Sequence, residues 1–288
     1  MSRTPGHECV EPDWNEIWKC RQANHEISKV TEDKTHNWDK RENAERYDSN
    51  SCGEYDARIR MTLDGLAVTG ESRVLDIGAG PGTLAIPLAR RVKSVTAVEP
   101  GAGMVSILEE RAAREGITNI SCIQKRWEDV DPARDLTGPY DIVIASLSLT
   151  MEDIQAALEM MNSVARGVVC LYWFVDMPFW EKMYANLWEP LHGSMYYSGP
   201  KADCLFNVLY QMGIYANIEM MPLSKEYRFA SREEMESFFN QRFDAQSAKQ
   251  QEIVKQYLKQ LIRKDGRQIV ISGVSTFAKI WWEKTGKK

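Results

Sequence analysis

Three glycines at every second position follow an aspartate in the segment 76–83, which reads Asp-Ile-Gly-Ala-Gly-Pro-Gly-Thr. Glycine lets a ligand lie against bare backbone, and the first turn of a following helix offers unpaired N–H groups. A dinucleotide-binding loop uses the same place for pyrophosphate but spaces its glycines G-x-G-x-x-G. The carboxylate of Asp76 would repel pyrophosphate, whereas it suits a ligand that carries an ammonium or sulfonium group. The spacing therefore favours a ligand other than a dinucleotide.

A second acid, Glu99, stands 23 residues after Asp76 at the end of the apolar run 95–98. In a doubly wound sheet this position lies beside the ribose of a nucleoside that covers the glycine loop. The alternative interpretation is an acid stabilised by the dipole of a helix that begins near Gly101. Two acids at the ends of two adjacent strands favour the nucleoside site.

Short apolar runs alternate with amphipathic segments from Arg73 onward. The runs predict strands and the segments with helical periodicity predict helices. The predicted strands are 74–77, 95–98, 120–123, 141–145, 168–171, 216–221 and 269–281, and the predicted helices are 84–92, 104–114, 154–164, 202–212, one that begins at Ser231, and 248–264. Because strands that alternate with helices form a parallel sheet covered on both faces, the fold class is α/β. We expect a doubly wound, mostly parallel sheet of seven strands, with an antiparallel last strand after a turn at Asp265-Gly266.

Four segments differ in composition. Residues 1–69 have helical patterns and no strand pattern, so we expect a helical lid. Residues 70–175 contain the glycine loop and five predicted strands, which makes them the ligand-binding core. Residues 176–213 are rich in aromatic residues and methionine and interrupt the alternation, which indicates a lid insertion after the fifth strand. Residues 214–288 complete the sheet.

The composition is that of an ordinary globular protein, with 43% hydrophobic residues and a formal net charge of −5. No apolar run approaches the roughly 18 residues of a membrane span, and the polar beginning lacks a signal-peptide core, so a soluble, cytoplasmic protein is expected. Six cysteines without a C-x-x-C pair predict reduced thiols and no metal site. Ten lysines and arginines lie within 249–288. A solvated helix face explains this basic end more simply than a nucleic-acid partner, which the acidic body would repel.

The chain resembles the class I S-adenosylmethionine-dependent methyltransferases of small molecules, from its N-terminal helices to Trp281. Residues 76–82 are similar to the family's first motif, which wraps the methionine part of the cofactor. Residues 97–100 (Ala-Val-Glu-Pro) are similar to its second motif, at the ribose. Residues 124–128 stand where the family contacts adenine, and 140–146 are similar to its fourth strand. Upstream, 38–48 is similar to the helix that covers the cofactor in small-molecule members.

The resemblance implies S-adenosylmethionine as the cofactor and S-adenosylhomocysteine as its product. The residues implied to bind the cofactor are Trp38, Tyr47, Asp76, Gly78, Ala79, Gly80, Gly82, Thr83, Glu99, Pro100, Met104, Arg126, Trp127, Glu128, Ser146 and Leu147. Arg126 stands where many members carry an adenine-binding aspartate, so Glu128 or Asp129 takes that role if the alignment shifts, or backbone groups hold the base. Trp127 either stacks on the adenine or packs in the core. Residues 146–149 (Ser-Leu-Ser-Leu) replace an N-P-P-Y motif, which argues against amino methylation of adenine or glutamine.

A methyl group on sulfonium is already electrophilic, so the protein need only align a nucleophile with it and exclude water. We expect a small-molecule acceptor beneath the N-terminal helices and the insertion, against an aromatic wall that suits a flat, apolar or cationic compound. The wall comprises Trp173, Phe174, Phe179, Trp180, Tyr184, Trp188, Tyr196 and Tyr197. The alternative is an aromatic mini-core that holds the lid to the sheet. His192 and His36 are the candidate general bases, and the alternative for each is a surface or hydrogen-bonded histidine.

Three other functions are compatible with parts of this pattern. A methyltransferase that acts on RNA or protein would use the basic C-terminal helix to dock its substrate. A non-catalytic protein would keep the cofactor pocket without an acceptor site. A nicotinamide dehydrogenase is disfavoured by the glycine spacing and by Asp76.

Overall fold

The computed structural model describes residues 11–28, 38–45 and 54–284. Its centre is an eight-stranded sheet in the order β3-β2-β1-β4-β5-β8-β6, with β7 paired to β8. The strands are β1 (Arg73–Ile77), β2 (Ser94–Val98), β3 (Ile120–Ile123), β4 (Tyr140–Ser146), β5 (Ala165–Phe174), β6 (Asn217–Phe229), β7 (Arg263–Asp265) and β8 (Gln268–Glu283). Strands β1 to β5 run parallel, and β8 runs antiparallel to β5 and β6. The predicted α/β fold with an antiparallel last strand is confirmed.

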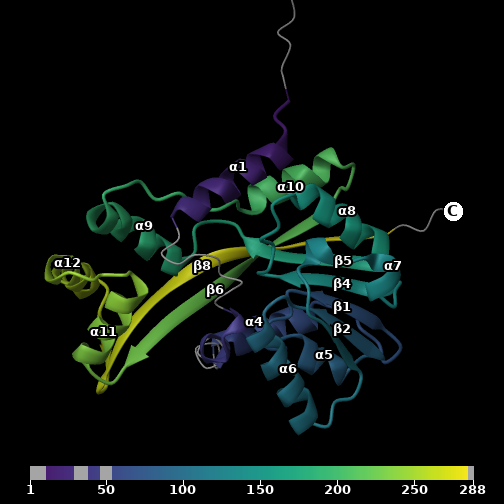
Figure 1. Cartoon of the computed structure of the whole chain (residues 1–288), viewed down its shortest axis with the longest axis horizontal. Helices are drawn as coiled ribbons and strands as arrows, with labels where there is room; N and C mark the ends of the chain where they lie inside the picture. The colour runs from purple at the N-terminus through teal and green to yellow at the C-terminus, as the bar shows by residue number, and fades with distance from the viewer. Residues whose placement is uncertain (1–10, 29–37, 46–53, 285–288) are drawn as a thin grey trace, which may run out of the picture.

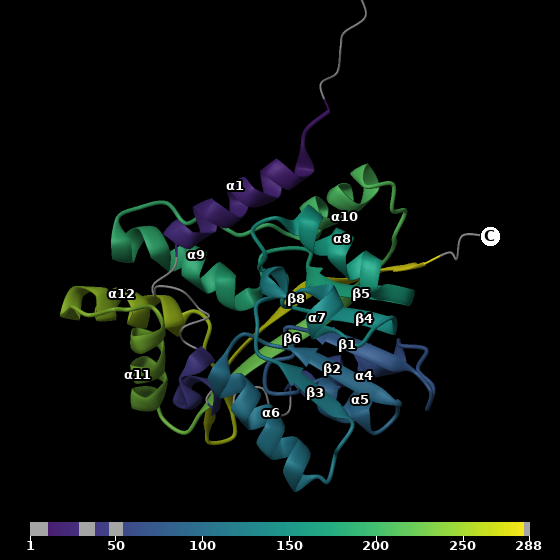
Figure 2. The same cartoon turned by 45° about the vertical axis from the view of Figure 1, so that its right-hand side comes forward.

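Helices cover both faces of the sheet (Figure 1 and Figure 2). The helices are α1 (Trp14–Ile27), α4 (Glu54–Asp64), α5 (Ala85–Ala89), α6 (Ala102–Arg114), α7 (Pro132–Asp135), α8 (Ile154–Val164), α9 (Phe179–His192), α10 (Ala202–Gln211), α11 (Arg232–Arg242) and α12 (Ala248–Lys259), with a 3₁₀ turn at Trp127–Asp129. Helices α1, α8 and α10 cover one face, and α4, α5 and α6 cover the other. Each central strand is therefore buried on both sides, which explains its continuous apolar run.

The sheet has one strand more than the seven predicted, because the helix α12 ends earlier than predicted. The apolar stripe predicts a helix over 248–264, but α12 ends at Lys259. Residues 263–265 instead pair with 268–270 around Asp265-Gly266, where Gly266 has a φ of +59°. Hydrogen bonding to β8 thus replaces the last helical turn, because tertiary pairing overrides local helix propensity.

Strands β6 and β8 extend beyond the carboxyl end of β5. Only residues 277–283 of β8 pair with β5, whereas 269–281 pair with β6. Strand β6 is therefore longer than the predicted 216–221. Helices α9, α11 and α12 pack on this extension around a separate core that includes Met183, Phe239 and Val254 (Figure 1). The extension projects from the same sheet edge at which β1 enters the glycine loop.

The predicted N-terminal lid lies on both faces of the sheet. Helix α1 packs on α8 and α10, and the Nε1 of its buried Trp18 donates to the carbonyl of Met151 at 2.9 Å. Residues 38–45 instead contact α6, on the opposite face. Among the described helices, none is long and apolar enough to cross a membrane.

Candidate functional site

The glycine loop turns over the end of β2. The N–H groups of Gly78 and Ala79 donate to the carbonyl of Val98 at 2.8 and 3.2 Å. Gly78, Gly80 and Gly82 all have positive φ, which glycine adopts without a steric penalty. A Cβ on Gly78 would lie 2.2 Å from the Cβ of Ser148, whereas a Cβ on Gly80 would meet no atom within 4 Å. Gly78 is thus needed for packing, and Gly80 faces open space.

Glu99 ties this loop to the first turn of α6. One carboxylate oxygen accepts from the N–H of Gly80 and the other from the N–H of Gly101, both at 2.9 Å. Burial raises the pKa of Glu99, and these two hydrogen bonds act against that rise. The carboxylate is therefore held in one orientation at the carboxyl end of β2.

Asp76 is a buried acid beside the loop, with 2% of its surface exposed. Its Oδ2 has no hydrogen-bond partner among the described residues. Burial and the nearby Glu99 raise the pKa of Asp76 to about 7, and Arg58 partly offsets this rise. A buried carboxylate without a partner is costly, so the site is suited to a cationic group.

Arg58 completes the site, and the sequence analysis missed it. This residue of α4 is 5% exposed, and its Nη1 donates to the Oγ of Ser146 at 2.7 Å. Arg58 and Asp76 line one small cavity, whose remaining lining residues are Gly78, Ala79, Gly80, Pro81, Thr83, Leu84 and Ser146. The cavity thus brings a cation and a carboxylate to the glycine loop. The available signal was an arginine on the buried face of an amphipathic helix.

Residues 38–45 lie over the first turn of α6, next to Glu99. The Oδ1 of Asp39 accepts from the N–H of Ala102 at 2.9 Å, and Trp38 and Met104 share a small apolar cluster. Gly103 allows this approach, because a Cβ there would lie 2.7 Å from the carbonyl oxygen of Trp38. The segment is therefore in place to cover a ligand at Glu99. Tyr47 and His36 lie outside the described residues.

The predicted adenine segment divides between surface and core. Arg126 and Glu128 are exposed, and the Nη2 of Arg126 lies 3.6 Å from the Oε1 of Glu128. Trp127 is buried, and its Nε1 donates to the carbonyl of Ala157 at 3.1 Å, as the packing alternative describes. Leu147 follows β4 with a φ of 58°.

The predicted aromatic wall is divided among separate clusters. Trp173 packs on Trp18 in the core beneath α1, with 6.1 Å between ring centroids. Phe179 and Tyr184 belong to the core of the extension. Phe174 and Trp180 form an edge-to-face pair 5.5 Å apart, half-buried against the core that contains Ala79 of the glycine loop. The mini-core alternative thus describes several of these aromatics, and Phe174 and Trp180 pack on the face of the sheet that α4, α5 and α6 cover.

A fourth aromatic cluster contains the candidate base His192. This histidine is exposed at the end of α9, and its ring lies 4.3 Å from that of Trp188. The ring of Trp188 lies 5.7 Å from that of Tyr196, whose hydroxyl donates to Glu181 at 3.2 Å. His192 does not line the cavity of the glycine loop.

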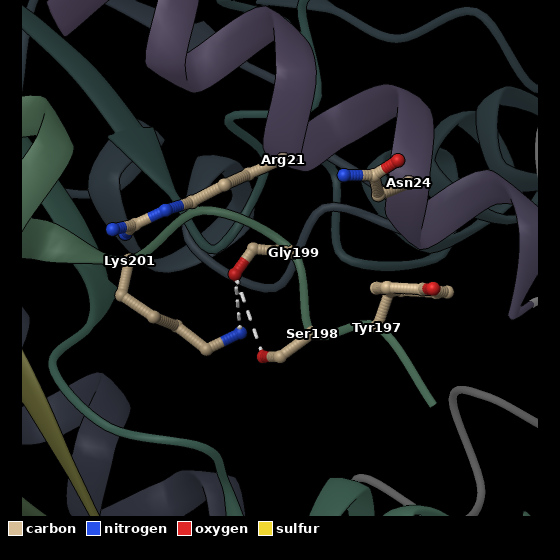
Figure 3. Close-up of a pocket in the computed structure, with 6 residues that line it drawn as sticks. All are labelled: Arg21, Asn24, Tyr197, Ser198, Gly199 and Lys201. Carbon is tan, nitrogen blue, oxygen red and sulfur yellow. Dashed lines mark hydrogen bonds between the residues drawn. The ribbon is translucent and has the colours of Figure 1, made fainter. Parts of the chain in front are cut away.

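A separate cavity of about 260 Å³ lies between α1 and the loop before α10 (Figure 3). Its lining residues are Arg21, Asn24, Tyr197, Ser198, Gly199 and Lys201. Arg21 pairs with Asp203 at 2.8 Å, and Lys201 pairs with Glu181 at 3.1 Å. Both cations are thus neutralised by the protein. Tyr197, assigned to the acceptor wall, lies here.

The strand order, the glycine loop and the acids at the ends of β1 and β2 define a class I S-adenosylmethionine-dependent methyltransferase fold. Residues 74–167 match the family model described as a methyltransferase domain. The resemblance to this family that the sequence indicates is confirmed over these residues.

Three comparisons place the chain among known proteins. It is 30% identical over 184 residues to an uncharacterized protein of Haemophilus influenzae. This alignment covers 64% of this chain and 65% of that protein. It is 34% identical over 109 residues to the 23S rRNA (uracil(1939)-C(5))-methyltransferase RlmD of Pseudomonas fluorescens. This alignment covers 32% of this chain and 24% of the relative. The chain thus spans just under two thirds of the first relative and about a quarter of the second. The crystal structure of YcgJ from Bacillus subtilis has the same fold, with a TM-score of 0.55 and 16% identity over 80% of this chain and 98% of that chain.

Proposed function

We propose that this chain transfers a methyl group from S-adenosylmethionine to a small-molecule acceptor. The proposal is carried by one observation, the opposite charges of Arg58 and Asp76 in the cavity of the glycine loop. The amino-acid end of S-adenosylmethionine carries both an ammonium and a carboxylate group. Asp76 would hold the ammonium group and Arg58 the carboxylate. The ammonium group would supply a partner for the buried Oδ2 of Asp76, which is expensive to bury without one.

Glu99 would hold the ribose of the same ligand. Its two oxygens already accept from Gly80 and Gly101, but a carboxylate has about four lone-pair sites. Those that remain can accept from ribose hydroxyls while the main-chain bonds keep the carboxylate in place. Residues 38–45, which contact α6 beside Glu99, would close over the nucleoside.

The cofactor supplies an electrophilic methyl group when it is bound, and the residues of this chain orient the acceptor and exclude water. Phe174 and Trp180 support a flat or apolar acceptor, because their half-buried rings pack against the core that contains Ala79 of the glycine loop. The extension formed by β6, β8, α11 and α12 projects from the same edge and would enclose a small compound. His192, exposed and remote from the cavity lining, stays a candidate base.

Calorimetry with three ligands tests the proposal. We expect S-adenosylhomocysteine to bind and NAD not to bind. Arg58→Met should weaken S-adenosylhomocysteine binding at least tenfold, about 1.4 kcal/mol. The same variant should leave the binding of 5′-methylthioadenosine unchanged, because this nucleoside lacks the amino-acid end.

Arg60→Met is the matched control, since Arg60 lies on the exposed side of α4. It should change the affinity of neither nucleoside. Binding of NAD in place of S-adenosylhomocysteine, or an equal loss of both nucleosides in Arg58→Met, would contradict the proposal. An acceptor screen that includes ribosomal RNA then separates a small-molecule enzyme from an RNA enzyme.

A further inference from the structure

Lys279 of β8 is a buried lysine without a carboxylate partner among the described residues. It is 9% exposed and stands between the buried Ala278 and Ile280. Its Nζ donates to the main-chain carbonyl of Gly65 at 2.8 Å and lies 4.6 Å from the centroid of the Trp281 ring. A buried ammonium group is expensive unless hydrogen bonds compensate it. The hydrogen bond to Gly65 therefore compensates the burial of the Lys279 ammonium group.

Gly65 directly follows Asp64, the last residue of α4. Its N–H closes the last turn on the carbonyl of Met61 at 3.0 Å, and its own carbonyl points out of the helix. Carbonyls at a helix C-terminus lack intrahelical partners and carry the negative end of the helix dipole. Lys279 supplies both the missing donor and the complementary charge, so it anchors the C-terminal end of α4 to the sheet.

Arg58 is held on the same face of the same helix. Residues 58, 62 and 65 are spaced i, i+4, i+7, which places them along one side of α4. Arg58 and Thr62 are buried on that side, and Arg58 donates to Ser146. Because Lys279 fixes the C-terminal end of α4, it also fixes the rotation of this helix about its axis and the distance of Arg58 from the sheet.

The two anchoring points, Lys279 and Ser146, stand on β8 and β4, the two strands that flank β5. Lys279 of β8 is opposite Tyr172 of β5, and Tyr172 is opposite Ser146 of β4. The anchor at the end of α4 and the hydrogen bond of Arg58 thus lie in one row across the sheet. The row gives α4 a fixed position relative to the cavity of the glycine loop.

We propose that Lys279 is a positioning residue that seats α4 so that Arg58 meets the carboxylate of the cofactor's amino-acid end. This inference rests on the proposed function. Lys279 itself lies outside the cavity lining and acts through Gly65 and α4.

The test compares two nucleosides in Lys279→Met, which keeps the apolar stem and removes the donor. We expect S-adenosylhomocysteine to bind five- to tenfold more weakly and 5′-methylthioadenosine to bind within twofold of the wild type. Amides 63–66 should exchange faster with solvent in the free variant. Lys279→Arg, which retains a donor and a charge, should recover most of the lost affinity.

Lys284→Met is the matched control. Lys284 follows β8 and also donates to a helix carbonyl, that of Asn162 in α8, on the other face of the sheet. Its loss should leave both affinities unchanged. In an Arg58→Met background, Lys279→Met should add no further loss of S-adenosylhomocysteine binding, because the two residues act on one contact.

Two results separate the two proposals. A wild-type chain that binds no S-adenosylhomocysteine overturns the proposed function. A wild-type chain that binds it, with an affinity that Lys279→Met leaves unchanged or lowers equally for both nucleosides, overturns the positioning role alone.

Discussion

The Oε2 of Glu99 lies 2.9 Å from the amide nitrogen of Gly80. The acid at the end of one strand thus holds the loop that leaves the neighbouring strand. Because the other oxygen binds Gly101, the loop and the first turn of α6 share one carboxylate. Ribose recognition and loop geometry therefore depend on the same side chain.

Glu99→Gln should weaken ligand binding and also destabilise the glycine loop. A carboxamide offers one acceptor oxygen, so Gly80 or Gly101 would lose its partner at a cost of about 1–3 kcal/mol. We expect S-adenosylhomocysteine affinity to fall at least tenfold and the melting temperature to fall by several degrees. Glu115→Gln, which removes a surface ion pair with Arg90, is the control. Unchanged affinity in Glu99→Gln would remove Glu99 from the binding site.

Gly78 and Gly80 should respond differently to alanine. Gly78→Ala combines a φ of +71° with a Cβ 2.2 Å from that of Ser148, so thermal unfolding should show a loss of about 2 kcal/mol or more. Gly80→Ala meets no atom within 4 Å, and its φ of +55° should cost only about 1–2 kcal/mol. Its methyl group would stand beside the cavity, so it should reduce S-adenosylhomocysteine binding more than stability. Equal unfolding temperatures for the two variants would contradict this distinction.

Asp76 should make the free protein less stable as the pH rises. Its pKa is raised from the ordinary 3.8 to about 7 in the folded chain. Between these values the folded state binds a proton that the unfolded state has released, so stability falls as pH increases from about 4 to about 7. Asp76→Asn should flatten this dependence and raise the melting temperature at pH 8. A variant with the wild-type pH profile would show that Asp76 is ionised at little cost.

Ligand binding should release a proton near pH 6. An ammonium group beside Asp76 favours its ionised form, which lowers its pKa on binding. The affinity for S-adenosylhomocysteine should therefore increase between pH 5 and pH 8. Titrations at pH 6 in two buffers with different ionisation enthalpies should show the proton, and Asp76→Asn should abolish the difference. Identical binding heats in the two buffers for the wild type would argue against an ammonium group at Asp76.

Trp180→Ala should affect the acceptor and spare the cofactor. Trp180 packs edge-to-face on Phe174, against the core that contains Ala79 of the glycine loop. In a methyl-transfer assay with an acceptor found by screening, we expect the acceptor KM to rise about tenfold with the S-adenosylmethionine KM unchanged. Tyr184→Phe, which removes a hydroxyl bonded to the carbonyl of Arg242 in the extension, should lower only the melting temperature. A Trp180→Ala variant with lower stability and wild-type kinetics would assign Trp180 to the mini-core.

The amino-acid sequence by itself determined the features that depend on neighbouring residues. The apolar runs and helical periods predicted the alternating core, and the glycines of 76–83 predicted a loop whose bare backbone a ligand can contact. Asp76 and Glu99 could be placed together because adjacent strands of a parallel sheet end at one edge. The helix predicted to begin at Ser231 has this residue as its N-cap, and the Ser231 side chain accepts from the N–H of Glu234.

Only the tertiary structure decided the features that join distant parts of the chain. Arg58 meets Ser146 across 88 residues, and Lys279 meets Gly65 across 214. No local pattern encodes either contact, because each depends on where α4 lies on the completed sheet. For the same reason the aromatic residues of 173–197, adjacent in sequence, were dispersed among separate cores. Pairing with β8 likewise turned the end of a predicted helix into β7, since a strand partner can override a local helical period.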